Sequence, residues 1–275
     1  MNISVITGSR ADFGLLEWPV KCLREDPFFG VALVNIWGHT PAQALEAMSE
    51  HLSQNTPDCV LVLGDRYEIL SAAIAAHLLR IPIAHIGGGD VSEGSYDNAM
   101  RDCISRLARI HFATSAVATT RLRAMGYMDV HDVGNPAIDY IMHADWQKTP
   151  TTNEPYVVVA YYPETIDDTV DLETVNAAIN GRKAVWITPN PDRGVERIPN
   201  GYTFSHDDFL NLLVYAEEFI GNSSAIFYEA PELGVKTKLI GKRQRGRVVP
   251  WGDGNASERI IKILKDHAPH TPRAA

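Results

Sequence analysis

Carboxylate side chains gather behind a run of three glycines, and side chains of this type can transfer protons. The glycines are residues 87–89, and they are followed by Asp90, Glu93, Asp97 and Asp102. Carboxylates that share a site can divide acid and base work when their surroundings push their pKa values apart. A glycine-rich loop often holds phosphate, but negative side chains repel it. The pattern therefore favours acid–base chemistry at this loop.

Asp65 and the pair formed by Asp97 and Arg101 each admit both a structural and a functional role. Asp65 stands in the sequence GDRYE, directly after the apolar run 59–63. An aspartate at the start of a helix commonly caps it, so capping and catalysis are both open for Asp65. Asp97 and Arg101 are four residues apart in a helical pattern, which places them on one face. They fit either a surface ion pair or part of a site.

Anion-binding patterns occur elsewhere in the chain. Gly8-Ser9-Arg10 follows the first apolar run, and Gly221-Asn-Ser-Ser224 follows a later one. A turn of this kind offers backbone N–H groups and hydroxyls to phosphate, although a plain turn or a serine N-cap would look the same. Glu229 could accept hydrogen bonds from ribose hydroxyls. The segment 241–247, GKRQRGR, fits a phosphate clamp or a solvated loop.

The elements that must position these residues alternate along the chain. Apolar runs at 2–8, 31–38, 59–65, 81–89 and 110–115 are separated by helical patterns at 11–25, 41–55, 68–80, 96–108 and 116–126. Such alternation predicts parallel sheets covered on both faces, with ligands at the carboxyl ends of the strands. The polar segment 145–155 reads as a linker. We therefore predict two doubly wound Rossmann-type domains, 1–148 and 149–275, with a cleft between them.

Composition narrows the class of protein. The chain has 275 residues, a formal net charge of −9 and 45% hydrophobic residues, which disfavours nucleic acid or an anionic membrane as a partner. Three scattered cysteines and the lack of a metal-ligand spacing predict free thiols, a reducing cytoplasm and no metal. No apolar run approaches the roughly 18 residues of a membrane span. A homodimer is the assembly we expect.

Seven motifs occur in an order that resembles the hydrolysing UDP-N-acetylglucosamine 2-epimerase family. They are GSRADFG, LGDRYE, the His-x-Gly-Gly run with EGSYDNAMR, YYPET, PNPDRG, GNSSAIFYEAPELG and GKRQRGR. The resemblance spans nearly the whole chain. It implies a GT-B-like fold and the conversion of UDP-GlcNAc and water to ManNAc and UDP, by elimination to a 2-acetamidoglucal and then hydration. It implies no cofactor.

The resemblance also implies roles for particular residues. Asp65 and Asp97 would be catalytic carboxylates and Asp90 a third. The UDP moiety would be held by Arg10, Ser223, Ser224 and Glu229. We predict a wider set of residues that contact the UDP-sugar: Glu93, Arg101, Tyr162, Asn190, Arg243 and Arg247. On this interpretation the glycine loop faces the sugar, and the diphosphate lies at the arginines and the GNSS turn.

The sequence departs from the family pattern in identifiable places. Asp90 stands where glutamate is usual, Tyr162 replaces a histidine, and Arg101 is followed by Asp102 in place of a basic residue. The segment between WGH and LGDRYE is also shortened. Two alternatives to the hydrolysing enzyme follow: a non-hydrolysing UDP-GlcNAc 2-epimerase, and a nucleotide-sugar binding or regulatory protein without turnover.

Overall fold

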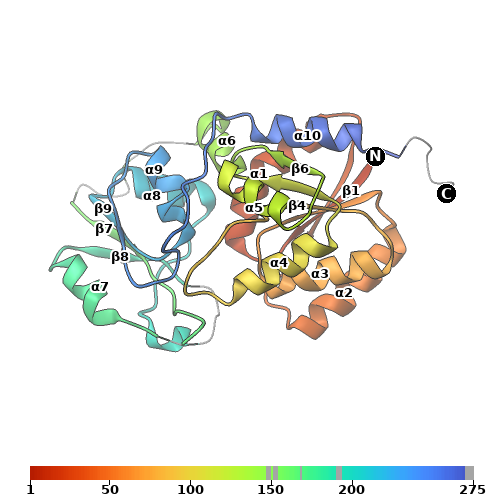
Figure 1. Cartoon of the computed structure of the whole chain (residues 1–275). Coiled ribbons are helices and arrows are strands. Elements are labelled where there is room, and N and C mark those ends of the chain that lie inside the picture. The colour runs from red at the N-terminus through yellow and green to blue at the C-terminus, as the bar shows by residue number, and fades with distance from the viewer. Residues whose placement is uncertain (147–149, 151–153, 168, 190–193, 270–275) are drawn as a thin grey trace. The chain divides into compact units, whose positions relative to one another are not determined.

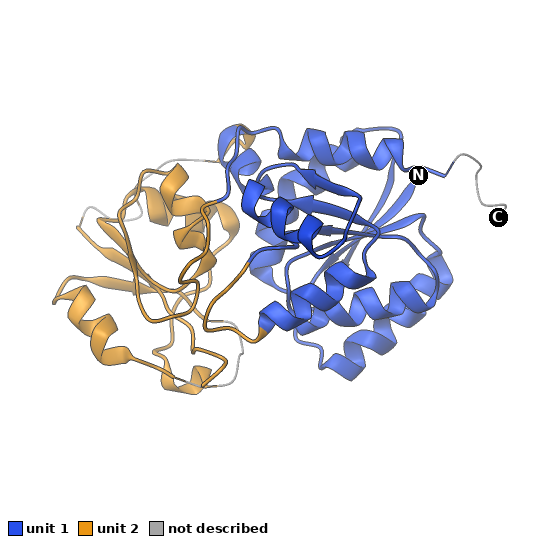
Figure 2. Ribbon diagram, in the orientation of Figure 1, with its two compact units in different colours: residues 1–90, 97–142, 250–275 blue, residues 91–96, 143–249 orange. Residues whose placement is uncertain are grey.

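The computed structural model describes residues 1–146, 150, 154–167, 169–189 and 194–269, shown as a cartoon in Figure 1. The chain forms two compact units, which are coloured in Figure 2. Unit 1 comprises residues 1–90, 97–142 and 250–275, and unit 2 comprises residues 91–96 and 143–249. Each unit is an α/β structure built on its own parallel sheet.

The sheet of unit 1 has six parallel strands in the order β2-β1-β3-β4-β5-β6. The strands are β1 (Asn2–Thr7), β2 (Gly30–Asn35), β3 (Cys59–Leu63), β4 (Ile83–Ile86), β5 (Ile110–Ala113) and β6 (Val130–Asp132). The order reverses between β1 and β3, and such a switch point is where open α/β sheets bind ligands. The residues that follow β1 and β3 are Gly8-Ser9-Arg10 and Gly64-Asp65.

Helices cover both faces of this sheet. They are α1 (Arg10–Glu25), α2 (Pro41–Asn55), α3 (Tyr67–Leu78), α4 (Asp97–Leu107), α5 (Ala116–Ala124), α6 (Pro136–His143) and α10 (Ala256–Asp266). Apolar residues of α1 and α10 pack on one face, and those of α2, α3 and α4 pack on the other. Local signals place the helix starts: Ser9 caps α1, and Thr40 and Gln43 form a capping box at α2.

Unit 2 is smaller and repeats the same design. Its parallel strands run in the order β10-β9-β7-β8, namely β7 (Val157–Ala160), β8 (Ala184–Trp186), β9 (Glu218–Gly221) and β10 (Thr237–Leu239). Its helices are α7 (Leu172–Ile179), α8 (His206–Val214) and α9 (Glu229–Glu232), with short 3-10 helices η1 (Val195–Arg197) and η2 (Ser224–Ile226). Its strand order reverses between β7 and β9.

The units are not the two contiguous halves that the predicted division at residues 148 and 149 describes. The predicted division leaves α10 in the second domain, whereas Ile260 and Leu264 of α10 lie in the core of unit 1. Both carboxylate oxygens of Asp139, in α6, accept hydrogen bonds from the first turn of α10, from Ala256 N at 3.1 Å and Ser257 N at 2.6 Å. The last helix is therefore fixed to the first sheet by its core side chains and by a buried carboxylate.

Candidate active site

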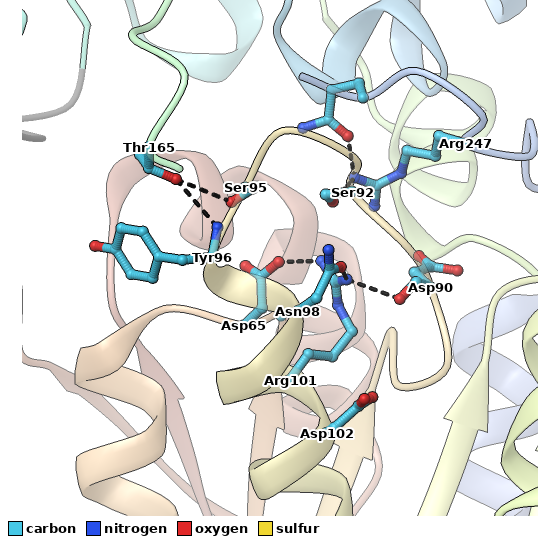
Figure 3. A network of polar contacts seen from close by, with 12 residues as sticks. Asp65, Asp90, Ser92, Ser95, Tyr96, Asn98, Arg101, Asp102, Thr165 and Arg247 are labelled. Atoms are coloured by element: carbon cyan, nitrogen blue, oxygen red, sulfur yellow. Dashed lines mark hydrogen bonds and ion pairs between the residues drawn. The ribbon is translucent and has the colours of Figure 1, made fainter. Parts of the chain in front are cut away.

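In unit 1, a buried guanidinium connects two of the predicted catalytic aspartates (Figure 3). Arg101, on α4, pairs with the carboxylate of Asp65, which follows β3. Its Nη1 donates to the main-chain oxygen of Asp90 at 2.8 Å and to Asn98 Oδ1 at 2.9 Å. Because Arg101 is only 2% exposed, it acts as an internal brace. The structure thus brings Asp65 and Asp90 to one guanidinium at the ends of neighbouring strands.

Asp90 is also contacted by the residue that follows β5, and Asp97 begins the next helix. Thr114 Oγ1 lies 3.3 and 3.4 Å from the two carboxylate oxygens of Asp90. Asp97 is the first residue of α4, one position beyond the predicted helix start at Tyr96, and it is partly buried. The three predicted catalytic aspartates therefore occupy the end of β3 and the two flanks of the β4–α4 loop, all within unit 1.

A buried histidine supports this edge of the sheet. His85 in β4 has its Nε2 2.8 Å from the carbonyl oxygen of Gly64 and its Nδ1 3.1 Å from Ser105 Oγ. Burial lowers the pKa of His85 to about 4, so the ring is neutral at pH 7. Since a carbonyl can only accept, Nε2 carries the proton and Nδ1 accepts from the serine. His85 thereby fixes the main chain directly before Asp65.

Sequence reasoning missed Asp12, which lies in the first turn of α1. Asp12 is 9% exposed, and its Oδ2 has no hydrogen-bond partner among the described residues. Burial raises its pKa to about 7; Arg66 opposes this shift and Asp65 adds to it. An acid two residues after Arg10, on the buried face that continues with Leu16, was the signal available in the sequence. Arg10 itself is exposed at the start of the same helix.

Residues 91–96, between the predicted catalytic positions 90 and 97, belong to unit 2. The main-chain oxygen of Glu93 accepts a hydrogen bond from Gln244 N at 3.1 Å. Ser92 Oγ lies 3.2 Å from Arg247 Nη1, and both residues are labelled in Figure 3. Tyr96 N donates to Thr165 Oγ1 at 3.2 Å. Residues 91–96 are thus anchored on the YPET and GKRQRGR segments, although the residues on either side of them, Asp90 and Asp97, belong to unit 1.

The switch point of unit 2 joins the predicted residue Tyr162 to the GNSS turn. Tyr162 N donates to Asn222 Oδ1, and Asn222 Nδ2 donates to Tyr162 O, both at 2.8 Å. Gly221 has a φ of 141°, and a Cβ there would lie 2.0 Å from the carbonyl oxygen of Ala160, so only glycine fits. Glu164 Oε1 accepts from Lys242 N at 2.5 Å. Three loops are thereby fixed to one another.

The arginines of the GKRQRGR segment make internal contacts. Arg243 donates to the carbonyl oxygen of Pro163 at 2.9 Å, and its guanidinium lies 5.4 Å from the centre of the Tyr162 ring. Arg247 donates to Gln244 Oε1 at 2.6 Å and to the Tyr228 hydroxyl. Its positive charge stays beside Glu229, since Arg247 is among the groups that lower the pKa of that carboxyl. Both arginines therefore organise the segment as well as supply charge.

The residues predicted to hold UDP lie after β9. Ser223 accepts from Ala225 N at 3.3 Å and caps η2, where Ser224 is the first residue. Only a 3-10 turn and the four-residue α9 follow, so the helix that the sequence suggested is short. Glu229 is buried, which raises its pKa, and its Oε2 has no partner among the described residues. Asn190 lies outside the described residues.

The described residues contain neither a candidate metal site nor a candidate membrane span. No group of three or more histidine, cysteine, aspartate or glutamate side chains there could hold a metal ion. No helix in that part of the chain combines the length and the apolar character needed to cross a bilayer. The site is therefore described by its carboxylates, arginines, hydroxyls and backbone groups.

The fold and these strand ends define a class of protein, namely one with two doubly wound α/β units that carry polar side chains at the switch point of each sheet. In a complex of S. aureus MnaA with UDP, a chain that is 17% identical matches with a TM-score of 0.80, covering 97% of this chain and 96% of that one. The predicted GT-B-like fold class is confirmed for the two units, and the cleft stays a prediction. The model of the UDP-N-acetylglucosamine 2-epimerase family matches residues 35–249, and the chain belongs to that family of enzymes.

Two curated relatives illustrate the spread of names among similar proteins. The polysialic acid biosynthesis protein P7 of Escherichia coli is 28% identical, over 96% of this chain and 86% of the relative. A UDP-N,N'-diacetylbacillosamine 2-epimerase (hydrolyzing) of Legionella pneumophila is also 28% identical, over 98% and 97%. The two alignments extend over 338 and 366 positions, more than the 275 residues of this chain. The relatives therefore have internal residues that this chain lacks.

Proposed function

We propose that this protein is a hydrolysing UDP-N-acetylglucosamine 2-epimerase that converts UDP-GlcNAc and water to ManNAc and UDP. The observation that carries the proposal is the Arg101 brace, which holds Asp65 and Asp90 at the carboxyl ends of neighbouring strands. Proton transfers at one carbon need more than one positioned carboxyl group. The name of the Legionella relative, which specifies a hydrolysing 2-epimerase, supports the hydrolysing branch.

The proposed reaction has two stages. In the first, a carboxylate removes the C2 proton, the C1–O bond breaks, and UDP leaves with the bonding electrons to give 2-acetamidoglucal. In the second, water adds at C1 and a carboxyl group returns a proton to C2 on the opposite face. We assign the proton transfers to Asp65, Asp90 and Asp97.

We assign the nucleotide to residues of unit 2 together with Arg10. A diphosphate leaving group needs cationic and N–H stabilisation as its charge develops. Ser223 and Ser224 offer N–H and hydroxyl donors after β9, and Arg10, Arg243 and Arg247 would supply the positive charge. The predicted partners Glu93, Tyr162 and Asn190 complete the set. Glu229, which is buried and has an oxygen without a partner among the described residues, suits the ribose hydroxyls.

Two other functions have a specific basis. The family description names UDP-N-acetylglucosamine 2-epimerase without the qualifier hydrolysing, which leaves room for conversion of UDP-GlcNAc to UDP-ManNAc. Asp90, Tyr162 and Asp102 depart from the expected pattern at the site, which leaves room for a binding protein without turnover. The name of the Legionella relative adds a modified UDP-hexosamine as a substrate to test.

Incubation with UDP-GlcNAc in deuterium oxide, followed by proton NMR, distinguishes these functions. We expect free ManNAc that carries deuterium at C2, together with UDP. UDP-ManNAc with deuterium at C2 would favour the non-hydrolysing reaction. Binding of UDP-GlcNAc without exchange at C2 would contradict both enzyme functions. A parallel incubation with UDP-N,N'-diacetylbacillosamine tests the substrate class, because its release as the free epimerised sugar would move the substrate assignment to that compound.

The role assigned to Asp97 gives a prediction of its own. Asp97→Asn should reduce turnover by about 10³-fold, because the substituted amide cannot exchange a proton with the sugar. UDP affinity, measured by isothermal titration calorimetry, should stay within about twofold of the wild type, since no uridine or phosphate contact is assigned to this residue. Glu46→Gln, on the exposed face of α2, is the control. A large loss of UDP affinity would show that Asp97 contributes to nucleotide binding instead.

A further inference from the structure

The main-chain oxygen of Asp90 is approached by two guanidinium groups from different helices. Arg101 Nη1, on α4, donates to it at 2.8 Å. Arg121 Nη1, on α5, donates to the same oxygen at 3.5 Å. Together with the contacts from Thr114, Asp90 is thus held by α4, α5 and the end of β5. None of these contacts involves unit 2, so they are a property of unit 1 itself.

Arg121 is oriented by a carboxylate on the neighbouring helix. Its Nη2 lies 3.1 Å from Asp102 Oδ2 and 3.5 Å from Asp102 Oδ1. The two side chains are 33% and 34% exposed. Ion pairs with this much exposure contribute little to stability, so the pair is poorly explained as a device that holds the fold together. A carboxylate does fix the plane of a guanidinium, and the other amino group of this one points to Asp90.

Because the Asp90 side chain is short, the position of its main chain determines where its carboxylate lies. An aspartate carboxylate is one methylene from Cα, so it moves nearly as far as the backbone that carries it. The preceding residues are the glycines 87–89, of which Gly87 and Gly89 have φ values of 81° and 80°. Glycine gives this segment conformational freedom that contacts must remove. Because a displacement of about 1 Å can reduce a catalytic rate by about 10²-fold, such contacts bear directly on proton transfer.

We propose that Arg121 and Asp102 are positioning residues, which hold the main chain of Asp90 so that its carboxylate stands at the reacting carbon. Asp102 orients Arg121, and Arg121 acts on the Asp90 carbonyl as a second anchor beside Arg101. The proposal rests on the proposed function only in giving Asp90 a proton-transfer role. The anchor itself is a statement about unit 1 with or without substrate.

Steady-state kinetics with UDP-GlcNAc test the effect on the reaction. Arg121→Gln should lower kcat about tenfold and leave KM within about twofold, because the anchor affects geometry at the reacting centre and not ground-state binding. Arg121→Lys should recover part of the loss. Asp102→Asn should lower kcat by about threefold, and Asp102→Glu should come close to the wild type. The double variant Arg121→Gln/Asp102→Asn should be no slower than Arg121→Gln alone, since both changes break the same chain of contacts.

Arg106→Gln on the exposed face of α4 is the matched control and should leave kcat unchanged. Unaltered kcat in Arg121→Gln, or effects of the two substitutions that simply multiply, would overturn the proposal. A rise in KM with constant kcat would also overturn it, because Arg121 would then contribute to substrate binding.

Amide hydrogen exchange gives a second test that needs no turnover. In a peptide that covers residues 86–92, we expect Arg121→Gln and Asp102→Asn to exchange faster than the wild type, while Arg106→Gln matches it. Equal exchange in all four proteins would overturn the anchor whatever the enzyme does. If both variants exchanged faster than the wild type but the wild type showed no turnover, the anchor would stand and the proposed function would fail.

Discussion

At the scale of single residues, the site contains more buried acid than the proposed reaction uses. Asp12 lies beneath the switch point of the first sheet, close to Gly64, and its carboxyl shares its surroundings with Asp65. Its ionisation is costly because burial removes water from the charged form. The carboxyl is therefore about half-protonated near neutral pH.

Asp12 gives a prediction about stability and pH. Its pKa rises from 3.8 to about 7 on folding, so the unfolded chain loses this proton first, and stability falls as the pH rises from about 4 to about 7. Asp12→Asn removes that dependence. The stability gained by the substitution should grow by about 2–3 kcal/mol between pH 5 and pH 8.5, measured by urea unfolding. Asp266→Asn, at an exposed position in α10, should show no such growth. A gain that is equal at both pH values would show that Asp12 ionises normally.

At the scale of elements, each sheet positions its polar residues by hydrogen bonds that join the ends of two neighbouring strands. In unit 1 the His85 ring connects β4 to Gly64 after β3. In unit 2 the Asn222 side-chain amide forms hydrogen bonds with both the N–H and the C=O of Tyr162, which follows β7. Asn222 is fully buried, so its two hydrogen bonds satisfy groups that no water reaches.

Asn222 offers a test of this arrangement. Asn222→Ala leaves the N–H and C=O of Tyr162 without their partner, which should lower the free energy of unfolding by about 2–4 kcal/mol. UDP affinity should fall about tenfold under the proposed function, because Ser223 and Ser224 lose their fixed turn. Asn222→Asp should retain the bond from Tyr162 N, but an ionised carboxylate cannot donate to Tyr162 O. The loss of stability should therefore be smaller at acidic pH, where the carboxyl is protonated, than at neutral pH. Calorimetry with UDP and urea unfolding measure both effects, and the exposed Asn200→Ala is the control. Unchanged stability in Asn222→Ala would refute the argument.

Elements with strong local signals could be predicted from the sequence, and those defined by distant contacts could not. The helix predicted at 41–55 is α2, because Thr40, Pro41 and Gln43 mark its start locally. By contrast α6, with its first five residues all buried, has no polar face to reveal its period, and it was missed. The six residues 91–96 also look continuous with their neighbours in sequence. Their membership of unit 2 depends on Gln244 and Arg247, roughly 150 positions away.

The same limit applies to the candidate site. Residue types and strand ends drew attention to Asp65 and to the acids that follow the three glycines, and the family resemblance then pointed to Asp65, Asp90 and Asp97 as the catalytic carboxylates. That Arg101 would brace two of them was not, since the Asp65–Arg101 pair joins residues 36 positions apart. Asp12 was passed over because its burial depends on the whole first sheet. Roles for these residues remain predictions for the experiments above.

At the scale of the whole molecule, the chain returns to its first sheet after completing its second. Residues 250–275 belong to unit 1, and α10 packs against α1. Asp139 secures this return with two hydrogen bonds to the start of α10, and it is fully buried. The core of the first unit is therefore complete only when α10, near the end of the chain, has folded onto it.

Asp139→Asn tests the importance of that return. An asparagine side chain has one acceptor oxygen and one donor NH₂ group, whereas Ala256 and Ser257 both present N–H donors. One of the two hydrogen bonds is therefore lost, and the NH₂ group lies against a main-chain N–H. We expect the free energy of unfolding to fall by about 2–4 kcal/mol. Amide exchange should accelerate first in α10, before the strands of the same sheet. Asp266→Asn, at the other end of this helix, should leave both measurements unchanged. A loss of stability spread evenly over unit 1 would show that α10 is not secured separately.

The path of the chain also determines which parts of the protein can be exchanged with those of relatives. The backbone passes from one unit to the other after residues 90, 96, 142 and 249. A hybrid that imports residues 143–249 from another family member would keep the native 91–96 segment, whose partners Gln244, Arg247 and Thr165 would then be foreign. Transplanting unit 2 from a relative therefore requires that residues 91–96 are exchanged together with residues 143–249, and recombination at a single crossover would separate the two segments.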